Sequence, residues 1–87
     1  RLAVERQKIE VRTARRKVDA AKKAVGTAET AMKKAVRTYE AGRLASTDVL
    51  ETEVELRRAR ARLARLETEL RIATARLERI VGRPASK

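Results

Sequence analysis

Few residues of this chain are suited to chemistry. It has no Cys and no His among its 87 residues, which excludes thiol nucleophiles, imidazole acid/base catalysis and Cys/His metal sites. The densest carboxylate cluster is Asp48, Glu51, Glu53 and Glu55. Because it lies where a helix is expected to begin, we interpret it as charge that complements the helix dipole. Ser46 and Thr47 have no nearby base and are interpreted as helix caps, so we expect no enzyme activity and no cofactor.

The chain is strongly basic, with 23 Lys and Arg against 12 Asp and Glu and a net charge of +11. No aromatic residues alternate with the basic ones, and no known DNA- or RNA-binding motif is present, so a nucleic-acid ligand is the weakest interpretation. A solvated helix face or a contact with acidic neighbours explains the charge better. No apolar run approaches the ~20 residues of a membrane-spanning helix, so we expect no direct membrane insertion by this segment.

Two sets of seven-residue repeats account for most apolar residues. In the first half, one row is Val4, Val11, Val18, Val25, Met32 and Tyr39, and the other is Ala14, Ala21, Ala28 and Ala35. In the second half, the rows are Val49, Leu56, Leu63, Leu70 and Leu77, and Thr52, Ala59, Leu66, Ala73 and Ile80. Such rows are the a and d positions of a coiled coil. The sequence therefore predicts an all-α fold, a long antiparallel two-helix coiled-coil hairpin.

A short break at residues 40–48 separates the two repeats. Gly42 is placed to adopt the left-handed conformation after a helix C-terminus, and Ser46, Thr47 or Asp48 can cap the next helix. Gly82 closes the second helix. We expect one hairpin over 1–87, with a helix over 2–41, a tip turn over 42–46, a helix over 47–81 and a polar tail over 82–87.

Further small residues, Ala20, Ala24 and Ala31 in the first half and Ala61, Ala64 and Ala75 in the second, widen the apolar surface beyond one stripe. A wide stripe suits a helix that contacts two or more neighbours. We therefore predict marginal stability for the isolated hairpin. The chain opens with Arg1 rather than Met, and we expect it to be a segment of a longer protein.

The turn has a recognisable pattern. Tyr39, Gly42, Asp48, Val49 and Leu50 have the spacing of the periplasmic tip motif of TolC-like outer membrane efflux proteins, which this chain resembles. The ending over 77–84 is similar to the end of a tunnel helix in that family. Where the family usually has an apolar residue after the tip glycine, this chain has Arg43, which is suited to a charged contact with an acidic residue of a partner.

The resemblance implies a function. Members of the family are trimers whose helical hairpins form a periplasmic tunnel, and the hairpin tips dock a periplasmic adaptor protein that leads to an inner-membrane pump in efflux or type I secretion. By resemblance, the adaptor-docking residues are Tyr39, Ala41, Gly42, Arg43, Leu44, Ser46, Thr47 and Asp48. The segment would lie in the periplasmic portion of a Gram-negative outer membrane protein, with self-association as a trimer.

Two alternatives stay open, the first within the same transport machinery and the second from a different class. One is the α-hairpin of the adaptor itself, whose tips carry an Arg, a Leu three residues later and a Ser seven residues after the Leu. Here Arg37 is followed at those positions by Glu40 and Thr47, so the adaptor pattern is not met. The other is a generic structural coiled coil with no transport role. It explains the repeats but not the spacing of the tip residues.

Overall fold

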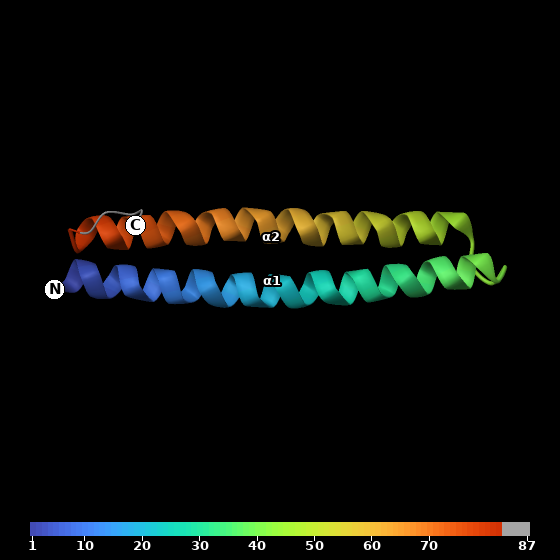
Figure 1. Cartoon of the computed structure of the whole chain (residues 1–87), viewed down its shortest axis with the longest axis horizontal. Coiled ribbons are helices and arrows are strands. Elements are labelled where there is room, and N and C mark those ends of the chain that lie inside the picture. Colours follow the sequence, from blue (N-terminus) through green and yellow to red (C-terminus); the bar gives the residue numbers. More distant parts are fainter. Residues whose placement is uncertain (83–87) are drawn as a thin grey trace.

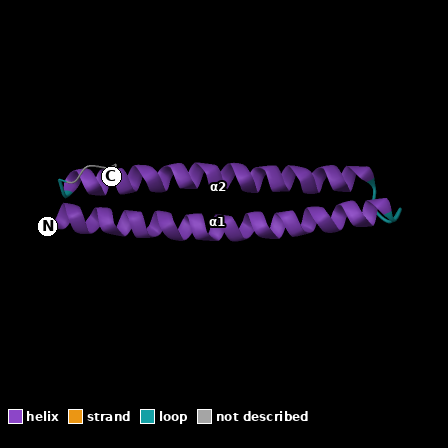
Figure 2. Cartoon of the chain, in the orientation of Figure 1, coloured by secondary structure: helices purple, strands orange, loops and turns teal. Residues whose placement is uncertain are grey.

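A computed structural model of the chain describes residues 1–82 and shows two long helices side by side (Figure 1). Helix α1 spans Leu2–Glu40 and helix α2 spans Ser46–Ile80. The described residues outside these helices form the connecting turn and the chain ends (Figure 2). The all-α hairpin is confirmed, and it extends 61 Å along its longest axis. Both helices end one residue before the expected position, α2 begins one residue early, and the tail beyond Gly82 lies outside the described residues.

The helices pack along the predicted a and d rows. The buried apolar residues all belong to these rows, and they are Val18, Ala21, Ala35, Leu56, Leu66 and Ala73. The rest of the rows is half-buried except at the tip end of α1 and the far end of α2, where Tyr39 and Ile80 are exposed. No described side chain is more than 98% buried, because a seam between only two helices leaves every residue near solvent.

One polar residue lies in this seam. Gln7 occupies the d position one heptad before Ala14, and it is 7% exposed. Its side-chain Nε2 donates a hydrogen bond to the backbone carbonyl of Ala73 across the hairpin, at 3.0 Å. Because the buried amide has this partner, it avoids the free-energy cost of an unsatisfied donor in the seam.

The same register brings oppositely charged side chains together across the hairpin. Arg60 Nη2 lies 3.4 Å from Glu29 Oε2. Glu29 lies four residues before Lys33 on its own helix, but its ion-pair partner is Arg60 on α2. Both side chains are about half exposed, so the pair contributes at most about 1 kcal/mol and serves mainly to favour this alignment.

We predict that Gln7→Leu leaves the free energy of unfolding within about 1 kcal/mol of wild type, because an apolar side chain of similar size fills the seam and the Ala73 carbonyl keeps its helical partner. The matched variant Gln7→Glu buries a carboxylate against a carbonyl oxygen and lowers the free energy of unfolding by roughly 2 kcal/mol or more. Urea unfolding followed by circular dichroism measures both. Equal losses in the two variants would show that the amide is needed for stability itself.

Candidate functional site

The tip of the hairpin begins with a hydrogen-bonded helix end. Gly42 has φ +74, and its N–H donates to the Tyr39 carbonyl at 2.9 Å. The Arg43 N–H donates to the Thr38 carbonyl at 2.9 Å. These two bonds form a Schellman motif, in which a left-handed residue reverses the chain while the last helical carbonyls stay satisfied. The predicted left-handed role of Gly42 is confirmed.

The start of α2 differs from the prediction. No side chain caps it: the N-cap is Ala45, in an extended conformation with φ −75 and ψ 150, and its carbonyl accepts the N–H of Asp48 at 3.1 Å. The prediction that Ser46, Thr47 or Asp48 is the cap was therefore wrong, because the short turn reaches its extended residue one position earlier. Asp48 lies in the first turn of the helix, where its charge complements the dipole.

The residues expected to dock a partner gather at the end of the hairpin opposite the chain termini (Figure 1). Those exposed to solvent are Tyr39, Ala41, Gly42, Arg43, Ser46, Thr47 and Asp48. Leu44 alone is half-buried, which anchors the turn. The a row predicts that Tyr39 is the last packing residue under the turn, and this was wrong, since 48% of it is exposed. The ring is therefore accessible to solvent at the tip.

Thr38 is a tip residue that the sequence reasoning missed. Its carbonyl accepts the Arg43 N–H, and its hydroxyl donates to the Lys34 carbonyl one turn back, at 2.8 Å. The signal was present in the spacing, because the residue four before a helix-ending glycine supplies the outer carbonyl of a Schellman motif. Thr38 therefore holds the backbone of Arg43 in place through its carbonyl.

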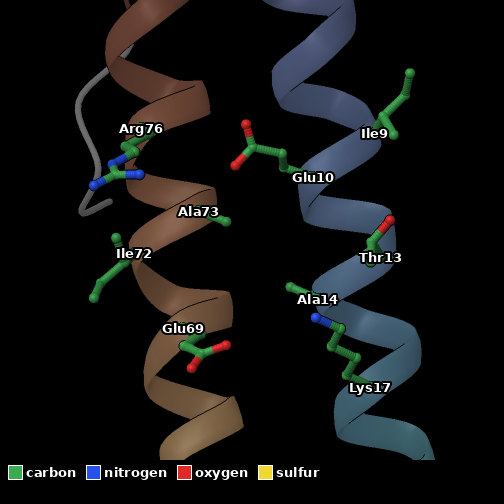
Figure 3. Close-up of a pocket in the computed structure, with 9 residues that line it drawn as sticks. All are labelled: Ile9, Glu10, Thr13, Ala14, Lys17, Glu69, Ile72, Ala73 and Arg76. Atoms are coloured by element: carbon green, nitrogen blue, oxygen red, sulfur yellow. The ribbon is translucent and has the colours of Figure 1, made fainter.

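A groove lies between the helices toward the other end. Ala14 and Ala73 face each other across it (Figure 3), and their small size leaves the space open. Ile9 and Ile72 point away from the facing helix and are 59% and 47% exposed. The remaining lining residues are Glu10, Thr13, Lys17, Glu69 and Arg76. Acidic and basic side chains both line this open surface, so it has no single charge that would select a ligand. We interpret the groove as a result of the small residues in the seam.

Within residues 1–82, no group of three or more acidic side chains is arranged to hold a metal ion. Neither α1 nor α2 is long and apolar enough to cross a membrane.

A comparison with protein families adds to this geometry. Residues 2–83 match the family described as outer membrane efflux protein. The chain belongs to this family. The match includes both helices and the whole tip, so the resemblance seen in the turn extends to the hairpin that carries it. No curated protein and no solved structure matches the chain.

Membership of the outer membrane efflux protein family bears on the alternatives. It favours a channel component over an adaptor hairpin or a coiled coil without a transport role. It is also a family of transport channels.

We predict opposite effects of alanine at two glycines. A Cβ added at either Gly26 or Gly42 meets nothing within 4 Å, so only the backbone distinguishes them. Gly26 lies inside α1, and Gly26→Ala raises the free energy of unfolding by about 1 kcal/mol through helix propensity. Gly42 has φ +74, and Gly42→Ala lowers it by about 1 kcal/mol. Denaturant unfolding of the two variants measures the difference, and a shift in the same direction for both would contradict the backbone account.

Proposed function

We propose that this chain is a periplasmic tunnel hairpin of a TolC-like outer membrane channel, and that its tip docks a periplasmic adaptor protein. The observation that carries the proposal is the match to the outer membrane efflux protein family across the whole hairpin, including the exposed tip. The channel serves efflux or type I secretion, and this segment lies in the periplasm of a Gram-negative cell.

The geometry of the tip supports docking. The left-handed Gly42 projects no side chain, so the backbone of a partner can approach closely. Arg43 directly follows it, is exposed, and makes no ion pair within residues 1–82. A guanidinium presented in this way is suited to a carboxylate on the partner tip.

Unpartnered apolar residues support self-association of the parent protein as a trimer. Leu50 and Val54 on α2 are 58% and 45% exposed, and Ala61 and Ala64 continue their row along the same helix. On α1, the exposed small residues are Ala20, Ala24 and Ala31. The two sets lie on different helices, so one copy can contact the next head to tail. Such contacts form a ring when the rotation between copies closes.

The test is binding of this hairpin to the α-hairpins of candidate periplasmic adaptors. Both partners are displayed on trimeric or hexameric carriers, because the affinity of single copies is expected to be weak. We expect saturable binding to one adaptor, and a loss of about tenfold or more in Arg43→Glu, which replaces a charge-assisted contact by repulsion.

The matched control is Arg16→Glu. It makes the same charge change on an exposed residue of α1 far from the tip, and we expect it to leave binding unchanged. Circular dichroism confirms that both variants fold. Absence of binding to every adaptor by the folded hairpin would contradict docking, and equal losses in both variants would assign the binding to net charge.

A further inference from the structure

The positive charge is concentrated at one level of the hairpin. Val18 and Ala21 of α1 pack with Leu66 of α2, and Glu29 lies against Arg60, so residues 12–28 lie level with residues 59–75. This middle section holds ten basic and three acidic residues, a net charge of +7. The tip section over 29–58 holds six of each and is neutral.

The ion pairs of the described residues engage basic residues of the tip section and leave most basic residues of the middle section unpaired. Arg57 pairs with Glu53 at 2.9 Å, and Arg58 lies 3.8 Å from Glu55. Among the described residues, Arg60 is the one basic residue of the middle section in an ion pair. All ten basic residues of this section are exposed. Neighbours three or four apart on a helix lie about 5–6 Å from each other, inside the Debye length of about 8 Å, so their fields add.

Both broad faces of the middle section are net positive. The heptad register places positions b and e on one face, and c and g on the other. The b and e face carries Arg12, Arg15, Lys22, Arg60 and Arg71 against Asp19 and Glu67. The c and g face carries Lys17, Arg62 and Arg65 against Glu69. Whichever face a tunnel wall turns toward its aqueous interior, that face presents excess positive charge.

We infer that the tunnel to which this hairpin contributes favours the passage of anionic solutes. The inference rests on the proposed channel function and adds a substrate class to it. A confined aqueous path lined by one sign of charge raises the local concentration of counter-ions, and rings of Arg or Lys are the means by which pores select anions. The middle section therefore acts as a positively charged collar, and the neutral tip section ahead of it does not oppose the entry of anions.

The test is ion selectivity of the full-length channel that carries this hairpin, reconstituted in planar bilayers of neutral lipid. The reversal potential in a KCl gradient reports the chloride-to-potassium permeability ratio, and we expect chloride to be preferred. The preference is expected to weaken as salt is raised, because screening shortens the range of the charges.

Two triple variants with the same change in charge locate its source. One is Lys17→Glu, Arg62→Glu and Arg65→Glu on the c and g face, and the other is Arg12→Glu, Arg15→Glu and Lys22→Glu on the b and e face. Glu is a strong helix former, and all six positions are exposed, so both variants are expected to fold. We expect the variant on the face lining the tunnel to shift the preference toward potassium, while the other serves as its control.

The outcomes separate this inference from the proposed function. Channel current with a potassium preference in the wild type, or with a chloride preference that neither variant shifts, overturns the anion preference and leaves the channel function standing. Absence of any current from the folded, inserted protein overturns the channel function, and the anion preference with it.

Discussion

The hairpin depends on one narrow seam in which a larger side chain alternates with alanine. Val18 and Leu66 are 4% and 5% exposed, and Ala21 between them lets the helices approach closely. Leucine side chains stabilise by about 1.5–3 kcal/mol each when fully buried, but three of the six buried apolar residues are alanines. A seam of this kind aligns two long helices without providing the core of an ordinary domain. The position of the turn and the level of the charged residues both follow from that alignment.

The alignment has consequences at the two levels of the hairpin to which we assign proposed functions. At the tip, it sets the distance that the turn must span, so the reversal is made by Gly42 and the backbone bond of Arg43, and the Arg43 side chain stays exposed to solvent. In the middle, it places the basic residues of both helices at one level, which concentrates charge that the sequence spreads over two distant segments. One register thus underlies both the proposed docking surface and the proposed collar.

The seven-residue repeats were enough to predict the fold, because burial follows the a and d rows almost to the ends of the helices. The left-handed conformation of Gly42 was also predictable, because the positive φ that follows a helix C-terminus depends on local sequence. The cap at Ala45 and the exposure of Tyr39 were not, because both depend on where the turn ends in space. Gln7 lies one heptad before the alanine row, at the same heptad position, but it is polar. The repeat of apolar residues therefore did not reveal its hydrogen bond to Ala73.

The central claim is that this chain closes one seam by itself and leaves its outer apolar faces for neighbours. Thermal unfolding of the isolated hairpin, followed by circular dichroism at a series of protein concentrations, tests it most directly. We expect a low melting temperature that rises with protein concentration, because association covers the exposed rows and stabilises the folded state by mass action. A sharp, cooperative transition at high temperature that is independent of concentration would contradict it.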